Sequence, residues 1–406
     1  MIEPFEIGRL PRILFGAGTR ARLPGLAAGF GDRVLLVTGA RSLRSSVHGR
    51  ALHESFATQG LEVHTLAVQG EPSPELVDAA VTEHRGRGID VVVGIGGGSA
   101  LDAAKAVAGL LPSGRSVMDH LEEVGRGVPY QGPSAPLIAA PTTAGTGSEA
   151  TLNEVLSRRG RDGFKRSFRH DALLPQWAVV DADLLETCPR ELRAADGLDA
   201  LTQLLESYLS LRASPFTDAL AEQGLAAARQ GLLPWYEDAR DPSLGSAARS
   251  AMAYAALLSG ITLAHAGLGV VHGLSAPLGA CFPLPHGVAC GTLLAPATAA
   301  NVAALRARDP GGPALGRYAR AWAILAGEGR TPGADAPSRL PDDAPERLVA
   351  LLEAWAGQLD MPRLSLFGVS EPDVPRIVER GRGGSTKSNP VVLNDEETAG
   401  ILRARL

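Results

Sequence analysis

The residues with the clearest capacity for chemistry lie in the second half of the chain. Asp199 and Gln203 are four positions apart, so they share one face if this segment is a helix. His272 and His286 follow within residues 250–305, which contain no Asp, Glu, Lys or Arg. One carboxylate and two imidazoles match a three-ligand metal site that leaves a position for a substrate oxygen. The structural alternative is an aspartate that caps a helix or pairs with a cation, and histidines that are hydrogen-bonded in the core.

A glycine-rich turn in the first half follows a predicted strand at residues 90–95 and precedes a helical pattern that begins near residue 100. Glycines in such a turn let the backbone approach a pyrophosphate, and the free N–H groups of the helix receive its charge. A tight strand-to-helix connection is the structural alternative. The expected cofactor-contacting residues of this turn are Gly96, Gly97, Gly98, Ser99 and Asp102.

A second polar turn follows the next predicted strand, residues 136–140. Because the carboxyl ends of parallel strands lie at one edge of a sheet, two such turns together favour a nucleotide site. The expected cofactor-binding residues of the second turn are Thr142, Thr143, Thr146 and Ser148.

The turn after the predicted strand at residues 33–38 bears on the choice between NADP and NAD. An acidic residue in this turn would hold a free ribose 2′-hydroxyl and repel a 2′-phosphate. Gly39 instead leaves room for that phosphate, and Arg41 and Ser42 offer partners for it. The pattern favours NADP, with NAD as the alternative if Arg41 is a solvated surface residue.

The wider sequence pattern predicts two kinds of domain. Short β-rich runs alternate with helical patterns in the first half, which indicates a parallel sheet covered by helices. From about residue 189 the patterns are helical. We therefore expect an α/β dinucleotide-binding domain at residues 1–185 and an all-helical domain for metal and substrate at residues 186–406. The predicted strands are residues 33–38, 61–66, 90–95, 136–140 and 178–181.

Composition excludes several classes of function. The chain has 406 residues, more than one hydrophobic core usually organises, and its net charge of -5 gives no reason to expect nucleic acid or an anionic membrane as a partner. Prolines, glycines and histidines interrupt the charge-free stretch, so we expect buried helices there and no membrane span. The three cysteines have no paired spacing, which indicates neither a disulfide framework nor a thiolate metal cluster. No secretory signal is visible, and we expect a cytoplasmic protein.

Four motifs resemble, in their order along the chain, those of the iron-containing (group III) alcohol dehydrogenases. The resemblance runs over nearly the whole chain. It implies the fold of that family, which is dehydroquinate-synthase-like, with an α/β N-terminal domain, an all-α C-terminal domain and commonly a homodimer. The segments that carry it are residues 11–18, 96–102, 141–149, and 267–273 with 285–287.

The resemblance also implies a metal site, from which this chain departs at two positions. The family's metal is held by an Asp and a His four residues apart on a helix and by two further histidines. Asp199, His272 and His286 match, whereas Gln203 replaces a histidine ligand and Ala276 replaces an additional active-site histidine. A neutral Gln oxygen is a weaker ligand than imidazole for Fe²⁺ or Zn²⁺, so we expect weaker metal binding. Related glycerol dehydrogenases use one carboxylate and two histidines, and maleylacetate reductases are thought to work without metal.

Three further residues are candidates for the site. His265 precedes His272 by seven residues, so on a continuous helix both would point the same way and His265 could serve as a substitute base. A packing role is the alternative. By resemblance, Lys165 aligns with a family lysine near the cofactor, and Lys387 lies in a loop that commonly borders the substrate. Lys387 would suit a carboxylate or phosphonate, although loop lysines are usually just solvated.

The leading hypothesis is hydride transfer between NAD(P)H and a small alcohol, aldehyde or keto acid. A metal on Asp199, His272 and His286, assisted by Gln203, would polarise the substrate oxygen. In a metal-independent version, like the maleylacetate reductases, His272 and His286 donate hydrogen bonds or a proton to the alkoxide. Two rivals are a non-redox cyclase of the dehydroquinate-synthase type and a nucleotide-binding relative that has lost catalysis.

Overall fold

The computed structural model describes residues 2–40, 43, 47–237, 242–328 and 340–406. The chain divides into two compact units. The sheet unit comprises Gly8–Arg158 and Gly163–Pro189, and the helical unit comprises Met1–Ile7, Arg159–Asp162 and Arg190–Leu406.

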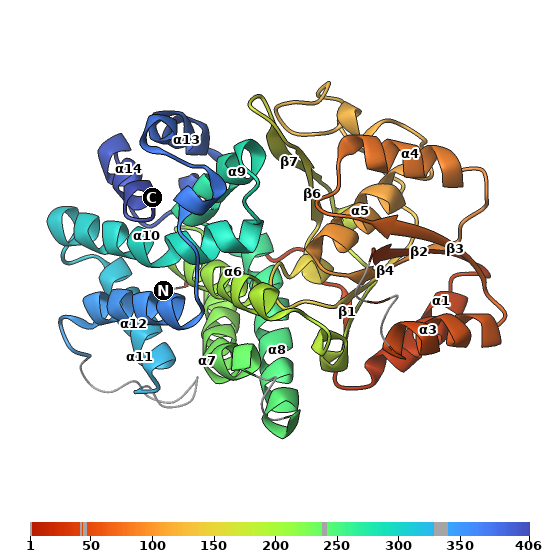
Figure 1. Cartoon of the computed structure of the whole chain (residues 1–406), viewed down its shortest axis with the longest axis horizontal. Helices are drawn as coiled ribbons and strands as arrows, with labels where there is room; N and C mark the ends of the chain where they lie inside the picture. Colours follow the sequence, from red (N-terminus) through yellow and green to blue (C-terminus); the bar gives the residue numbers. More distant parts are fainter. Residues whose placement is uncertain (1, 41–42, 44–46, 238–241, 329–339) are drawn as a thin grey trace. The chain divides into compact units, whose positions relative to one another are not determined.

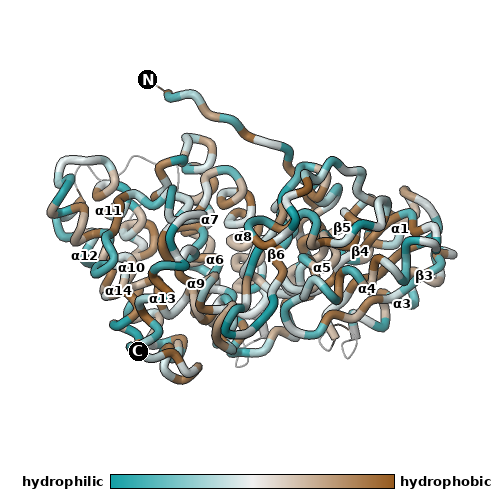
Figure 2. Tube along the Cα trace, turned by 90° about the horizontal axis from the view of Figure 1, so that it is seen from above, coloured by the Kyte–Doolittle hydropathy of each residue, from teal (hydrophilic) through white to brown (hydrophobic). Residues whose placement is uncertain are grey.

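The sheet unit is built on six parallel strands in the order β1-β8-β5-β4-β2-β3. The central strands β4 and β5 are buried along their whole length, and their apolar runs are typical of strands covered on both faces. Figure 2 marks such apolar residues in brown. The strands are β1 (Arg12–Phe15), β2 (Arg33–Gly39), β3 (Glu62–Val68), β4 (Val91–Gly96), β5 (Leu137–Pro141) and β8 (Trp177–Val180).

Helices cover both faces of this sheet (Figure 1). The helices α4 (Pro74–His84) and α5 (Gly98–Leu110) share one apolar cluster with the sheet. The helices α1 (Leu23–Ala28) and α3 (Val47–Thr58) contribute to a second cluster, on the other face. The parallel α/β architecture expected from the sequence is therefore confirmed.

The antiparallel hairpin of β6 (Asn153–Arg158) and β7 (Phe164–Arg169) is an element that the sequence patterns did not predict. The two strands carry four basic residues, which are Arg158, Lys165, Arg166 and Arg169. A polar hairpin of this kind lacks the continuous apolar run that identified the strands of the main sheet.

The helical unit confirms the all-α expectation for the second half. Its central helix α6 packs against α7, α8 and α10. Fifteen of the twenty residues of α6 are buried, because neighbouring helices cover it on several sides. The helices are α6 (Arg190–Leu209), α7 (Pro215–Glu237), α8 (Pro242–Ala266), α9 (Val270–Cys281), α10 (His286–Arg308), α11 (Pro313–Ala326), α12 (Ala344–Gln358), α13 (Val374–Gly381) and α14 (Asp395–Arg403).

Two helical segments of this unit, Gly245–Ala266 and His286–Arg308, are long and apolar enough to cross a membrane. In the structure, 61% and 72% of the most apolar 18-residue stretch of each helix are buried inside the protein. Core helices of globular proteins pass the same test of length and composition, and this burial agrees with the expectation of buried helices.

Candidate metal centre and cofactor loops

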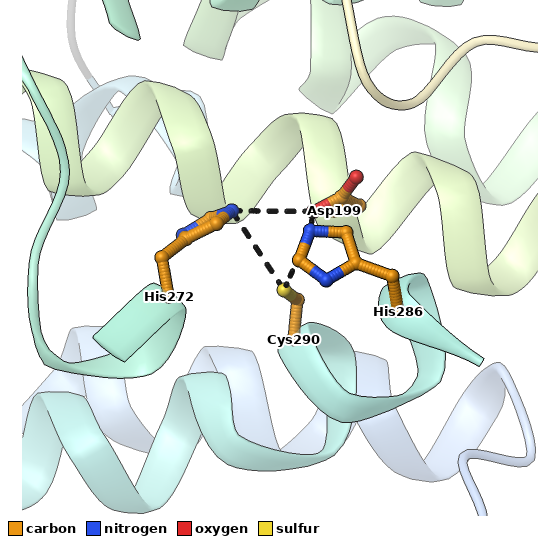
Figure 3. A group of neighbouring side chains, drawn as sticks. All are labelled: Asp199, His272, His286 and Cys290. Atoms are coloured by element: carbon orange, nitrogen blue, oxygen red, sulfur yellow. Dashed lines mark hydrogen bonds and ion pairs between the residues drawn. The ribbon is translucent and has the colours of Figure 1, made fainter. Parts of the chain in front are cut away.

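Four side chains from three helices of the helical unit converge on one point (Figure 3). Asp199 comes from α6, His272 from α9, and His286 and Cys290 from α10. Their potential ligand atoms all lie within 4.8 Å of one another. The Nε2 atoms of His272 and His286 lie 3.5 and 3.7 Å from Asp199 Oδ1. The convergence expected for the carboxylate and the two imidazoles is therefore present.

Close packing of α10 on α6 brings two of these side chains to Asp199. Gly287 and Gly291 lie one turn apart on α10, next to His286 and Cys290. A Cβ at Gly287 would lie 2.7 Å from the carbonyl oxygen of Ala195 on α6. A Cβ at Gly291 would lie 2.9 Å from a methyl group of Leu198, the neighbour of Asp199. Glycine at position 287 therefore lets the two helices approach this closely, whereas a Cβ at position 291 would require the Leu198 side chain to shift.

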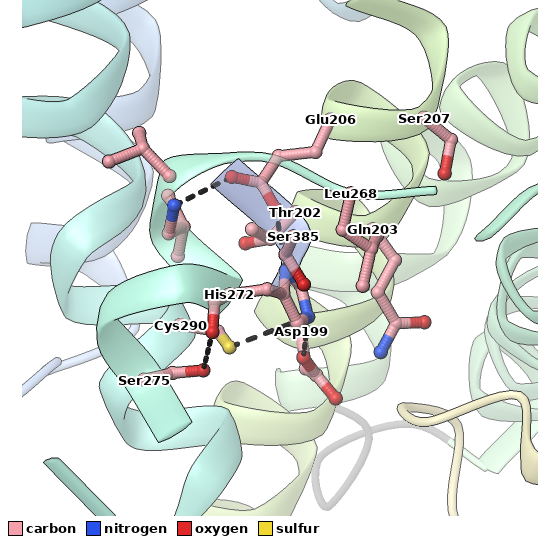
Figure 4. Close-up of polar contacts among 12 residues, drawn as sticks. Asp199, Thr202, Gln203, Glu206, Ser207, Leu268, His272, Ser275, Cys290 and Ser385 are labelled. Atoms are coloured by element: carbon pink, nitrogen blue, oxygen red, sulfur yellow. Dashed lines mark hydrogen bonds and ion pairs between the residues drawn. The ribbon is translucent and has the colours of Figure 1, made fainter. Parts of the chain in front are cut away.

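Glu206 lies seven residues after Asp199 on α6, and its carboxylate orients His272 (Figure 4). Its Oε2 lies 2.6 Å from His272 Nδ1, and its Oε1 accepts a hydrogen bond of 2.7 Å from the Val271 backbone N–H. The same carboxylate thus satisfies the first turn of α9 and holds the imidazole ring. If the ring donates from Nδ1 to Glu206, its Nε2 lone pair faces Asp199 and Cys290, which is the arrangement of many metal-bound histidines.

The group combines a buried carboxylate with two imidazoles. Burial lowers the pKa of His272, but Cys290, Asp199 and Glu206 raise it well above its usual value, so a cation would bind here in competition with a proton. Both carboxylate oxygens of Asp199 are buried and have no hydrogen-bond donor among the described residues. Burial alone would raise the pKa of Asp199, but His286 and His272 lower it to about 2. Burial raises the pKa of the Cys290 thiol to about 11. Without a metal the thiol of Cys290 therefore stays protonated. A coordinated cation would favour the thiolate instead, because metals deprotonate the thiols that bind them.

The structure places Gln203, the residue expected to assist a metal, and Cys290 in different surroundings. The Oε1 atom of Gln203, the oxygen expected to assist a metal, accepts a 2.7 Å hydrogen bond from Ser259 on α8. Cys290, which the sequence analysis missed, instead places its sulfur 3.7 Å from His272 Nε2 and 3.8 Å from His286 Nε2. The signal that could have revealed Cys290 is its position four residues after His286 on one helix.

His265 and His272 do not lie on one continuous helix, which was the condition under which both rings would point the same way. Helix α8 ends at Ala266, Gly267 has a φ of +78°, and α9 begins at Val270. The break changes the chain direction, so the seven-residue spacing does not align the two rings. His265 Nδ1 lies 2.7 Å from the carbonyl oxygen of Ile261. Its role as a substitute base stays a prediction.

The loop that carries Lys387 lies against α9. This segment, η9 (Gly384–Ser388), packs on the helix. A Cβ at Gly273 would lie 2.4 Å from the methyl group of Thr386. Gly273 follows His272 directly. Lys387 itself is exposed, which leaves its ammonium available to a substrate anion.

In the sheet unit, the two predicted cofactor loops lie side by side at the carboxyl edge of the sheet. β4 and β5 are paired in parallel, with Gly96 opposite Pro141. A Cβ at Gly98 would lie 2.6 Å from the Thr146 methyl group, and one at Gly97 would lie 3.3 Å from that of Thr143. The contact between the loops therefore leaves no room for a Cβ at Gly98 unless Thr146 shifts, and leaves little room for one at Gly97. Gly39, at the end of β2, adjoins Gly96, while Arg41 and Ser42 lie outside the described residues.

Several polar residues of this edge have partners inside the sheet unit. Ser148 donates a 2.7 Å hydrogen bond to Asp102, and the fully buried Lys105 lies 4.0 Å from the same carboxylate. Lys165 forms a 2.8 Å ion pair with Glu71. Burial lowers the pKa of Lys105 to about 8. Of the predicted cofactor residues Ser99, Thr142, Thr143 and Thr146, Thr142 is buried and the other three are half-buried.

Comparison with known proteins agrees with this architecture. The family described as iron-containing alcohol dehydrogenase matches residues 11–182, and the C-terminal part of the Fe-containing alcohol dehydrogenase family matches residues 193–406. Together the two matches cover nearly the whole chain. The chain belongs to the iron-containing alcohol dehydrogenase family, as the sequence motifs predicted.

Named relatives support the same membership. The NADPH-dependent butanol dehydrogenase of Clostridium saccharobutylicum is 30% identical over 396 residues, which cover 96% of this chain and 95% of that protein. The probable alcohol dehydrogenase EutG of Escherichia coli K12 is 38% identical over 254 residues, 60% of this chain and 62% of the relative. A crystal structure of 1,3-propanediol oxidoreductase superposes with a TM-score of 0.85 at 28% identity, and the match covers 100% of both chains.

Proposed function

We propose that the chain is an NAD(P)-dependent dehydrogenase that transfers a hydride reversibly between nicotinamide and a small alcohol, aldehyde or keto acid. The observation that carries the proposal is the group of Asp199, His272 and His286 in a chain of this family. They offer one buried carboxylate, the nitrogen of the buried His272 and the nitrogen of the half-buried His286, and both imidazole nitrogens lie within 3.7 Å of the same carboxylate oxygen. This donor set fits a divalent cation.

A divalent cation bound there, Fe²⁺ or Zn²⁺, polarises the substrate oxygen, while the nicotinamide gives or accepts the hydride. Asp199, His272 and His286 are the residues that would hold the cation. Glu206 keeps the His272 ring in place through its 2.6 Å contact with Nδ1. Lys387 would attract an acidic group on the substrate, and assistance from Gln203 or His265 stays a prediction.

The paired loops of the sheet unit would hold the cofactor. Gly97 and Gly98 begin α5, whose free N–H groups suit a pyrophosphate. Thr143 and Thr146 lie beside them. The partners of Asp102 and Lys165 within the unit suggest that these two residues shape the loops, in addition to any contact with the cofactor. Gly39, with Arg41 and Ser42, favours NADP.

The direct test is an assay of the purified full chain with NADPH and NADH against a panel of short aldehydes and keto acids, and the reverse assay with alcohols. We expect cofactor oxidation that depends on the carbonyl substrate and is faster with NADPH. A cyclase would consume no NADPH. Tight cofactor binding without turnover of any substrate would identify a relative that has lost catalysis. Either result would contradict the proposed function.

A second candidate, the metal-independent reductase, is favoured by the bond between Gln203 and Ser259, which engages the oxygen expected at the fourth position. In that version His272 and His286 would donate hydrogen bonds or a proton to the developing alkoxide. Activity that survives complete removal of metal would select this candidate.

We also propose that residues 1–185 bind the dinucleotide and residues 186–406 the metal and substrate, in a cytoplasmic homodimer. Family membership is the support for this organisation. Light scattering of the purified protein would measure its oligomeric state, and a mass equal to one chain would contradict the dimer.

A further inference from the structure

We propose that Cys290 is the fourth protein ligand of the cation, in place of the histidine that Gln203 replaces. The inference rests on the proposed metal-assisted function. Its basis is the position of the Cys290 sulfur, which lies 3.7 Å from His272 Nε2 and 3.8 Å from His286 Nε2 (Figure 3). The sulfur and one oxygen of Asp199 also lie within 4.8 Å of each other.

The distances between these atoms match the edges of a coordination tetrahedron. A tetrahedral zinc ion with bonds of about 2.1 Å to nitrogen and oxygen and about 2.3 Å to sulfur holds its ligands about 3.4 Å (N–O) and about 3.6 Å (N–S) apart. The structure has 3.5 and 3.7 Å for the two N–O edges, and 3.7 and 3.8 Å for the two N–S edges. Octahedral right angles with the same bonds would need about 3.0 and about 3.1 Å. These four of the six edges therefore fit four protein ligands in a tetrahedron, and a substrate oxygen would have to enter as a fifth ligand.

The helices explain why a cysteine can occupy this position. Cys290 lies one turn after His286 on α10, so both side chains point toward α6. The close approach at Gly287 and Gly291 brings the short cysteine side chain within reach of the shared centre. Cys290 is 0% exposed, so the sulfur is protected from solvent.

A buried cysteine is often only a small apolar core residue. The surroundings of Cys290 differ from an apolar core, because two imidazole nitrogens and a carboxylate lie around its sulfur. Gln203, on the other hand, has its oxygen engaged by Ser259. The chain thus offers a donor set of one oxygen, two nitrogens and one sulfur.

This donor set changes the expected metal. Tetrahedral sites with thiolate and imidazole ligands are typical of zinc, whereas sites with only oxygen and nitrogen ligands are more often compatible with Fe²⁺. We therefore expect the centre to prefer Zn²⁺, and Co²⁺ as its spectroscopic substitute, over Fe²⁺, in a family that is named for iron.

The test is cobalt substitution in the full-length protein with its cysteines reduced. A thiolate bound to Co²⁺ gives a charge-transfer absorption in the near ultraviolet, which oxygen and nitrogen ligands do not give. We expect this band in the unaltered protein and in Gln203→Ala and Cys281→Ser, and its loss in Cys290→Ser. Cys281→Ser is the matched control, because Cys281 lies in the same unit and its sulfur contacts Arg380. The Zn²⁺ dissociation constant of Cys290→Ser should rise at least about 100-fold, since even indirect partners of metal ligands contribute about 10- to 100-fold.

Two results would overturn the inference. One is stoichiometric cobalt binding by the unaltered protein without a charge-transfer band, which needs no variant to fold. The other is a band that persists in Cys290→Ser. Neither would affect the proposed function, because Asp199, His272 and His286 would still hold the cation. Failure of the metal-assisted version of the function has a different signature, namely full activity without bound metal.

Discussion

The sheet edge and the metal centre reach their functions by different means. At the sheet edge, the chemistry depends on the backbone. A Cβ at Gly98 would lie 2.6 Å from Thr146, a Cβ at Gly97 would be in tight contact with Thr143, and the helix N-terminus offers its N–H groups. At the metal centre it depends on side chains from α6, α9 and α10 that meet around a buried carboxylate. A site built from the backbone depends on a short run of residues that tolerates few substitutions. A site built from side chains can lose one metal ligand and gain another from a neighbouring helix.

The two regions also treat buried charge differently. In the sheet unit, Asp102 and Lys165 have partners of the opposite charge or a hydroxyl donor. In the helical unit, both Asp199 oxygens have no donor among the described residues. A buried carboxylate oxygen without a donor also occurs on Glu154 of the sheet unit, but burial raises the pKa of Glu154, whereas the imidazoles 3.5 and 3.7 Å from Asp199 Oδ1 lower the pKa of Asp199. The charged carboxylate beside two imidazoles therefore marks the place where a cation would complete the structure.

The largest effect should follow from removal of the central carboxylate. We expect Asp199→Ala to lower kcat/KM about 1,000-fold or more, because polarisation by a metal contributes several kcal/mol to the transition state. Metal content, measured by elemental analysis, should fall in parallel. Asp218→Ala is the control, since this carboxylate of the same unit pairs with Arg317 at 2.9 Å. Equal losses in the two variants would contradict a special role for Asp199.

The second effect concerns a buried carboxyl in the sheet unit. Burial raises the pKa of Glu149 from 4.5 to about 7. Its folded pKa lies above its unfolded pKa, so its contribution to stability is complete below pH 4.5 and is lost as the pH rises through about 7. The unfolding free energy of the unaltered protein, relative to Glu149→Gln, should therefore fall by at most about 3 kcal/mol over this interval. Denaturant titrations at several pH values would measure it, and a constant difference would contradict the expectation.

The third effect tests how His272 is held. Glu206→Gln removes the charge that faces Nδ1 and should raise the metal dissociation constant about 10- to 100-fold. Competition with a chelator of known affinity gives this constant without reference to activity. The control is Glu222→Gln, which changes a carboxylate that bonds Arg320 at 2.9 Å in the same unit. An unchanged constant in Glu206→Gln would show that Glu206 only caps α9.

The smallest effect concerns the contact between the cofactor loops. The Cβ of Gly98→Ala would lie 2.6 Å from Thr146 and would push the two loops apart. This displacement of the loops should weaken cofactor binding about 10-fold. Gly25→Ala, where no atom lies within 4 Å, is the control. Adding Thr146→Ala to Gly98→Ala should recover part of the loss, as measured by fluorescence titration with NADPH. Equal binding by Gly98→Ala and the unaltered protein would contradict the packing role of the glycine.

The same contrast explains how much could be predicted from the sequence. The sequence predicts the sheet, the paired loops and the helical second half, because apolar runs and glycine turns are local patterns. Asp199, His272 and His286 were found through spacing and family motifs. Cys290 was missed because Asp199 and His272 come from other helices, although its spacing of four residues from His286 was a usable signal. The break at Gly267, which separates His265 from His272, and the polar β6–β7 hairpin also depend on tertiary packing.

The most direct test of the account is to compare metal content with activity in the same preparations. The protein would be dialysed against a strong chelator, then reloaded stepwise with Zn²⁺ or Fe²⁺, while NADPH-dependent carbonyl reduction and bound metal are measured together. The account predicts that activity disappears on chelation and returns in proportion to metal, up to one ion per chain. Undiminished carbonyl reduction with far less than stoichiometric metal would contradict it.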